Sequence, residues 1–145
     1  MIEAPEQAVL RRTCCSVWTH PLARLLLGER MHPGGERTTA ATVDALALER
    51  GSLVLDLGCG DGLGVRSLAA AGMVPVGIDL SPDAAKVASE AGAAVVGAAE
   101  NLPLRPASLD GAIAECVLSL VPDKAAALGE LHRVLRGGAA SPCRM

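Results

Sequence analysis

Short apolar runs and amphipathic stretches alternate along the central part of the chain. The apolar runs, rich in Val, Ile, Leu and Ala, predict buried β-strands at 52–57, 74–79, 93–97 and 109–116. Amphipathic stretches with helical periodicity predict helices at 63–71, 82–91 and 123–136. Because strands that alternate with helices are typical of βαβ units, we expect a mostly parallel sheet with right-handed crossovers.

Local signals mark the ends of several of these elements. Ser81 is a favourable N-cap and Pro82 suits the first helical position, so a helix is expected to begin there. Before the first strand, two further helices are expected at 21–28 and 38–50. The patterns divide the chain into a helical N-terminal segment, an α/β domain and an irregular tail, at 1–50, 51–138 and 139–145.

A glycine cluster follows the first predicted strand. The run Asp56-Leu57-Gly58-Cys59-Gly60-Asp61-Gly62 lies between that strand and a helix, which is the arrangement of a nucleotide-binding turn. The dinucleotide fingerprint G-x-G-x-x-G is not met, because Leu63 stands where its third glycine would be.

Two acidic residues refine this interpretation. A carboxylate at Asp56 would repel a pyrophosphate, whereas it would favour a cationic ligand such as S-adenosylmethionine, which carries an ammonium and a sulfonium. Asp79, at the end of the second strand, can accept bonds from both ribose hydroxyls, and this suits NAD and S-adenosylmethionine equally. The alternatives are structural: Asp56 could bond the amides of its own loop, and Asp79 could cap the helix at Pro82.

Charge and composition exclude several classes of function. The net charge is −3 and no basic stripe is present, so nucleic acid is not an expected partner. No apolar run reaches the roughly 20 residues that span a bilayer. The N-terminus lacks the basic start and apolar stretch of a signal peptide, so we expect no membrane partner and a cytoplasmic location.

The five cysteines and three histidines form no metal-ligand spacing, so no metal site is predicted. We interpret Cys59 and Cys116 as small apolar residues near the cofactor loops rather than reactive thiols. As an alternative, Cys14-Cys15 together with one of them could bind a thiophilic acceptor such as arsenite. His132 is expected on the exposed face of the last helix.

As an ordered set, five segments resemble the class I S-adenosylmethionine-dependent methyltransferases of the small-molecule type. The segments are VLDLGCGDG (54–62), GIDLS (77–81), AAENLPL (98–104), SLD (108–110) and LHRVLRGG (131–138). The resemblance covers roughly residues 50–138. It implies a Rossmann-like three-layer αβα sandwich and S-adenosylmethionine as the cofactor.

The resemblance also implies which residues contact the cofactor: Asp56, Gly58, Cys59, Gly60, Asp79, Leu80, Ala99, Glu100, Glu115 and Cys116. The first four would line the methionine end, and Asp79 would hold the ribose. Leu80 would pack on adenine, with Ala99 and Glu100 at its edge. Glu115 and Cys116 would face the methionine part and the methyl group. An N-terminal helix near 32–35 would form a lid, with Thr38 or Thr39 near the cofactor carboxylate.

The chain departs from the pattern of this family in two places. Ala98 stands where the family often has an Asp that bonds the adenine amino group, and Glu100 is a candidate substitute. After Gly137-Gly138 the family continues with further strands and helices, whereas 139–145 show no strand pattern. We therefore expect a sheet without its C-terminal strands and self-association through the exposed edge of the fourth strand.

Methyl transfer to a small-molecule acceptor is the function that these features favour. The reaction requires mainly that the acceptor lies in line with the sulfonium methyl, so the sequence names no catalytic residue and does not identify the acceptor. Two alternatives stay open. The chain could be a non-catalytic or truncated S-adenosylmethionine-binding fragment, or an NAD-binding module, which Asp56 and the incomplete fingerprint disfavour.

Overall fold

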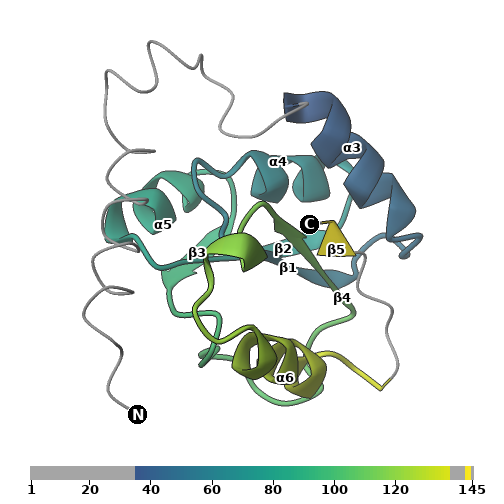
Figure 1. Ribbon diagram of the computed structural model, residues 1–145. Coiled ribbons are helices and arrows are strands. Elements are labelled where there is room, and N and C mark those ends of the chain that lie inside the picture. Colours follow the sequence, from purple (N-terminus) through teal and green to yellow (C-terminus); the bar gives the residue numbers. More distant parts are fainter. Residues whose placement is uncertain (1–34, 138–142, 145) are drawn as a thin grey trace. The chain divides into compact units, whose positions relative to one another are not determined.

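The computed structural model describes residues 35–137 and 143–144, and Figure 1 shows their helices and strands. The described residues from Glu36 onward belong to one compact unit, which holds the helix α3 (Gly35–Ala45) beyond its first residue, together with the sheet. The helix expected at 21–28, the His32–Gly34 loop and Cys14-Cys15 lie outside the described residues.

A parallel sheet organises this unit. Its order is β3-β2-β1-β4-β5, made of β1 (Leu53–Leu57), β2 (Val74–Asp79), β3 (Ala93–Val96), β4 (Gly111–Glu115) and β5 (Cys143–Arg144). Asp56 is in register with Gly77 on β2 and with Ile113 on β4. Helices on both sides complete the three layers, and the expected αβα Rossmann-like class is confirmed.

Helices connect the strands and cover both faces of the sheet. They are α4 (Leu63–Ala70), α5 (Pro82–Ala88), the 3-10 helix η1 (Leu118–Leu120) and α6 (Lys124–Val134). Ser81 caps α5 by accepting a bond from the Ala84 amide at 3.3 Å, as its sequence predicts. In Figure 1, α3, α4 and α5 lie on one face of the sheet and α6 lies on the other.

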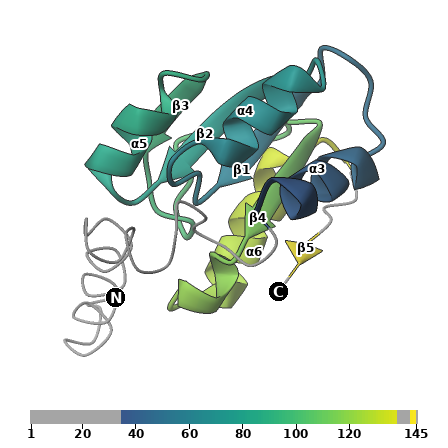
Figure 2. The same cartoon turned by 90° about the horizontal axis from the view of Figure 1, so that it is seen from above.

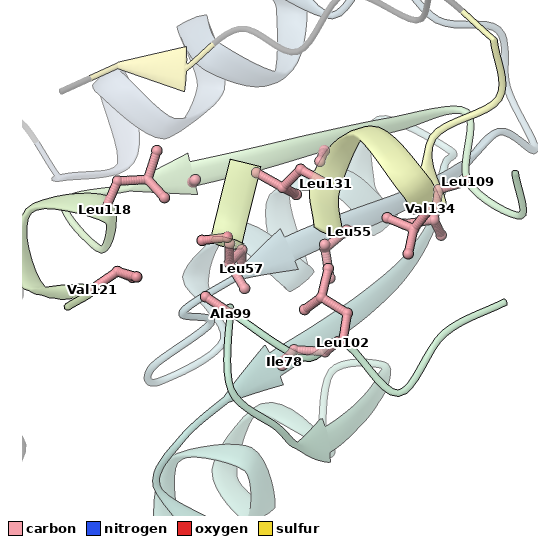
Figure 3. Packing of buried hydrophobic residues seen from close by; sticks show 13 residues of the cluster. Leu55, Leu57, Ile78, Ala99, Leu102, Leu109, Leu118, Val121, Leu131 and Val134 are labelled. Carbon is pink, nitrogen blue, oxygen red and sulfur yellow. The ribbon is translucent and has the colours of Figure 1, made fainter. Parts of the chain in front are cut away.

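Alternating strand positions build two separate cores. Leu55 and Leu57 of β1 face α6, where they join the larger cluster that Figure 3 shows. Other members of this cluster come from β2, β4, the following loops and α6: Ile78, Ala99, Leu102, Leu109, Ala112, Ala114, Leu118, Val121, Ala127, Leu131 and Val134. Each fully buried Leu or Val contributes about 1.5–3 kcal/mol through removal of apolar surface from water.

The opposite face of the sheet packs against α3 and α4. Val54 and Ile113 meet Val43 of α3, Leu46 directly after that helix, and Leu68 of α4. Because side chains alternate along a strand, Asp56 lies on the same face as Val54, and Glu115 on the same face as Ile113. Two carboxylates thus stand on the face that α3 and α4 cover.

The order of the strands also fixes where a ligand can bind. The chain runs from β1 outward through β2 to β3, then returns to place β4 on the other side of β1. The connections that follow β1 and β4 run in opposite directions, so the sheet has a topological switch point between these two strands. In α/β sheets, ligands bind in the crevice at the carboxyl edge of such a point. Asp56 and Glu115 lie near that edge.

Several expectations differ from the structure in detail. Helix α3 covers Gly35–Ala45 rather than 38–50, and β4 is shorter than 109–116 because Leu109 makes only an isolated bridge with Leu135. The helix η1 was not predicted. Within the described residues no helix is both long and apolar enough to cross a bilayer.

The chain end differs most from the expectation. The prediction that 139–145 are wholly irregular is wrong at Cys143–Arg144, which pair in parallel with Ala114 and Glu115 of β4. The carboxyl half of β4 is therefore not the open edge that the sequence suggested. A strand of two residues is too short to show the alternation of apolar and polar positions that marks a strand. The hydrophobic pattern of 139–145 therefore could not predict the pairing of β5 with β4.

Candidate functional site

The glycine loop is tied to the carboxyl end of β2 by its own amides. The amides of Gly58 and Cys59 donate to the Ile78 carbonyl at 2.7 and 3.2 Å, and the Gly60 amide donates to Asp79 Oδ2 at 3.0 Å. Further along, the Gly62 amide donates to the Cys59 carbonyl and the Leu63 amide to Asp61 Oδ1. A pyrophosphate cradle needs such amides as donors to the ligand, and here five of them already have partners within the protein.

Two of the glycines are required by the geometry of this loop. Gly58 has φ +73°, and a Cβ there would lie 2.6 Å from Val117 Cγ2. Gly64, in the first turn of α4, lets Asp56 approach closely: a Cβ at Gly64 would lie 2.3 Å from Asp56 Oδ2. The glycine run therefore serves to bring the end of β1, the loop and α4 together around a carboxylate.

Asp56 is a buried carboxyl surrounded by others. It is 5% exposed, and burial raises its pKa to about 7, with a further contribution from the negative charge of Glu115. Asp79 and Asp61 also raise the pKa, whereas a bond from the Val65 amide lowers it. The Val65 amide belongs to the first turn of α4, so this bond ties Asp56 to the helix after the glycine loop rather than to its own loop. The repulsion among the carboxylates also makes this edge favourable for a cation.

Asp79 links the second strand to both neighbouring segments. Its Oδ2 accepts from the Gly60 amide at 3.0 Å and its Oδ1 accepts from the Ser81 amide at 2.8 Å. A carboxylate has about four lone-pair positions, so these bonds leave room for two more donors, such as the hydroxyls of a diol. The helix cap itself comes from Ser81, which leaves Asp79 as a half-buried carboxylate at the carboxyl edge.

Glu115 closes the edge on the side of β4. Its Oε2 accepts from the Thr39 hydroxyl at 2.8 Å, and its Oε1 accepts from the Thr42 hydroxyl at 3.0 Å. Both threonines lie on α3 and are almost completely buried. Figure 2 shows α3 beside β4, with α4 over β1. The N-terminal helix is thus bonded directly to a carboxylate of the candidate site.

The other predicted site residues lie at the same edge but differ in exposure. Leu80 is 41% exposed, whereas Ala99 is buried in the large cluster and Glu100 is half-buried. The Cys59 side chain is buried against Val65 and Ala88, so its interpretation as a small apolar residue is confirmed, and burial raises its pKa to about 12. The Cys116 side chain is exposed and its φ is +58°, and for this residue the interpretation stays a prediction.

The structure also assigns roles to residues that the sequence analysis quoted without a role. Arg133 donates to the carbonyls of Leu102 and Leu104 at 3.1 and 2.9 Å and to Glu130 at 2.6 Å. It therefore fastens the loop after β3 to α6. These bonds link the segments at 98–104 and 131–138, which gives a structural reason for both. His132, within the second segment, is exposed on α6, as predicted.

Asp110 likewise forms hydrogen bonds between segments that are distant along the chain. It accepts from the Leu53 amide at 2.8 Å and from the Arg136 guanidinium, and these partners hold the pKa of Asp110 below its usual range. The sequence contained no signal for these links, or for the bonds of Thr39 and Thr42 to Glu115, beyond the presence of polar residues. Each of these bonds joins segments that are distant along the chain.

The arrangement suits a ligand with positive charge and a vicinal diol. Asp56, Asp61, Asp79 and Glu115 gather at the carboxyl edge beside a glycine loop, at the switch point of an α/β sheet. Within residues 35–137, no three His, Cys, Asp or Glu side chains are placed to hold a metal ion. The fold and the site together define a Rossmann-like domain with an acidic edge beside its glycine loop.

Comparison with known proteins names the family. The sequence profile described as "Methyltransferase domain" matches residues 55–141, and the chain belongs to that family. It is 36% identical over 91 residues to the malonyl-[acyl-carrier protein] O-methyltransferase of Serratia marcescens, covering 61% of this chain and 36% of that protein. It is 35% identical over 104 residues to the ubiquinone biosynthesis O-methyltransferase of Thiobacillus denitrificans, covering 66% and 45%.

A solved structure extends the likeness to the fold. The complex of Haemonchus contortus Phospholethanolamine N-methyltransferase 2 with phosphomonomethylethanolamine and S-adenosylhomocysteine matches with a TM-score of 0.72 at 25% identity. The match covers 78% of this chain and 29% of that one. The chain spans between 30% and 52% of the length of the curated relatives that it matches.

Proposed function

We propose that this chain binds S-adenosylmethionine at the carboxyl edge of β1, β2 and β4 and transfers its methyl group to a small-molecule acceptor. The observation that carries the proposal is the cluster of carboxylates around Asp56, at the switch point of the sheet and beside the glycine loop. Their mutual repulsion is relieved by a ligand that brings an ammonium and a sulfonium. The family supports the same cofactor, since one of its structural neighbours holds S-adenosylhomocysteine.

The residues have distinct roles in this proposal. Asp56 and Glu115 face the cationic methionine part, and Gly58 and Gly60 let the backbone approach it. Asp79 accepts from the ribose hydroxyls with the lone pairs that Gly60 and Ser81 leave open. Leu80, already 41% exposed, offers an apolar surface to the adenine.

The remaining predicted residues complete the same ligand site. Ala99 and Glu100 border the adenine edge from the loop after β3. Cys59 takes part through its backbone, because its side chain is buried in the opposite direction against Val65. Cys116 is exposed at the end of β4 and lies on the side of the methyl group.

The internal hydrogen bonds of the loop argue against the NAD alternative. Five loop amides are donors within the protein, so a pyrophosphate would have to displace bonds and also approach the Asp56 carboxyl. Both costs are absent for S-adenosylmethionine, which has no phosphate. The cofactor supplies an electrophilic methyl on a sulfonium, and the protein contributes by holding the acceptor in line with it.

Isothermal titration of the full chain with S-adenosylhomocysteine and with NAD tests the cofactor. We expect binding of the former, and Asp79→Asn should weaken it roughly tenfold because a charged acceptor to the ribose is lost. Asp83→Asn is the matched control, since Asp83 is exposed on the first turn of α5. Binding of NAD without binding of S-adenosylhomocysteine would overturn the proposal.

Turnover is tested separately. The purified chain is incubated with methyl-labelled S-adenosylmethionine and a panel of small hydroxyl, carboxyl and amine acceptors, and labelled products are measured. Transfer to one class of acceptor supports the methyltransferase, whereas cofactor binding without transfer to any of them would support the non-catalytic alternative.

A further inference from the structure

The threonine pair of α3 occupies a position that packing alone does not require. Thr39 and Thr42 are three residues apart, so their side chains share one face of the helix. They are 0% and 1% exposed, and Val43 of the same helix packs against the sheet together with Leu46, which directly follows the helix. Buried hydroxyls in a helix are usually paired within the helix or avoided, and here both donate to one carboxylate.

The carboxylate that they hold is the one that acts most strongly on Asp56 among its charged neighbours. Glu115 raises the pKa of Asp56 more than Asp79 or Asp61 does. Its position follows from the register of β4, since Asp56 pairs with Ile113 and Glu115 lies two residues further on the same face. Arg144 is its register partner on β5.

We infer that Thr39 and Thr42 are positioning residues, which fix the Glu115 carboxylate against Asp56 and so set the negative charge that faces the cofactor. This inference rests on the proposed function. It gives α3 a defined role, since the helix connects to the site through two hydrogen bonds to a charged group. In this inference the hydroxyls of Thr39 and Thr42 act on the ligand through Glu115.

Thr39 and Thr42 restrain the Glu115 side chain. A glutamate at the end of a strand has free rotation about three side-chain bonds, and its charge would move toward water without partners. Two hydroxyl donors, at 2.8 and 3.0 Å, bond one oxygen each and keep the carboxylate near Asp56. The Thr42 hydroxyl has a single proton and shares it between Glu115 Oε1 at 3.0 Å and the Thr38 carbonyl at 2.9 Å, which fixes its rotamer on the helix.

The test compares three variants of the full chain. Thr39→Val with Thr42→Val removes both hydroxyls at nearly constant shape, whereas Thr39→Ser with Thr42→Ser keeps them. Val43→Ala is the matched control, because it loosens the packing of α3 without touching the hydrogen bonds. The single Thr42→Val variant serves if the double valine variant does not fold, and an intermediate effect is then expected.

The readout is the affinity for S-adenosylhomocysteine, measured by isothermal titration at pH values from about 6 to about 8.5, around the pKa of Asp56. We expect the double valine variant to bind roughly tenfold more weakly at neutral pH, as expected for lost hydrogen bonds to a charged group. The midpoint of its pH dependence should move to lower pH, because Glu115 no longer repels the Asp56 charge. The serine variant should keep the affinity and the midpoint.

The outcomes distinguish this inference from the proposed function. If the unchanged protein does not bind S-adenosylhomocysteine, both are wrong. If it binds but the valine variant keeps its affinity and pH midpoint, only the positioning role is wrong. The positioning role is also wrong if Val43→Ala shifts the pH midpoint as far as the double valine variant does. The packing of α3 would then account for the shift without the two hydroxyls. Val43→Ala should instead lower the thermal midpoint and leave the pH profile in place.

Discussion

Asp56→Asn should make this protein more stable above neutral pH while weakening its ligand binding. Asparagine has nearly the same shape as aspartate, and its carbonyl oxygen can still accept from the Val65 amide. The change removes a charge that is buried at 5% exposure and faced by Glu115, Asp79 and Asp61. The variant therefore separates the cost of this carboxyl to folding from its use in binding.

The magnitude follows from the pKa of Asp56. The carboxyl titrates near 3.8 in the unfolded chain and near 7 in the folded protein. Between these values the native state holds a proton that the unfolded state has lost, so the free energy of unfolding falls as the pH rises. At about 1.4 kcal/mol for each pH unit, the loss is about 4 kcal/mol, complete above pH 7 and absent below about pH 4.

Urea denaturation followed by far-ultraviolet circular dichroism, at several pH values from about 5 to about 8, measures this difference. The stability of Asp56→Asn relative to the unchanged protein should rise across this range by about 2.7 kcal/mol, the part of the loss that falls between pH 5 and the folded pKa of about 7. Other titrating groups are common to both proteins and cancel. A difference that stays constant with pH would refute the reasoning.

Asp110→Asn is a control in which the substitution should change the stability in the opposite direction. Its partners Leu53 and Arg136 lower the pKa of Asp110, so this carboxylate stabilises the fold above its unfolded pKa, and the contribution is lost as acid protonates it. We expect Asp110→Asn to be less stable at neutral pH, with a difference from the unchanged protein that disappears only in acid. It should show no change around pH 7.

Two further predictions concern local packing and thiol reactivity. Gly64→Ala should destabilise the fold by about 1–3 kcal/mol, since its Cβ would lie 2.3 Å from Asp56 Oδ2, and thermal melting measures this loss. Gly129→Ala in α6 meets no atom within 4 Å and should instead be neutral or stabilising by up to about 1 kcal/mol; equal losses in both variants would contradict the role of Gly64. With iodoacetamide at about pH 8, peptide mass spectrometry should show fast labelling of exposed Cys116 and slow labelling of buried Cys59, whose pKa is raised to about 12. Equal rates at the two cysteines in the folded protein would show that the loop after β1 opens freely.

Local signals were sufficient for most of the α/β elements. The strand β2 was predicted at its observed bounds, and α5 begins at Pro82 as the Ser81 cap indicated. Such features depend on neighbouring residues: an apolar run needs burial, and a capping side chain bonds an amide three residues away. The same locality explains why the sequence predicts a ligand site at Asp56 and the glycine loop.

The tertiary structure decided which of these residues act on one another. The bond between Thr39 and Glu115 spans 76 positions of the chain, and the pairing of β5 with β4 follows a stretch without strand pattern. Neither can be read from the sequence, because each depends on which face of the sheet α3 covers and which edge the chain end reaches. The raised pKa of Asp56 also depends on the tertiary structure. Its residue type and place after the strand come from the sequence, but its burial and the approach of Glu115 are properties of the folded chain.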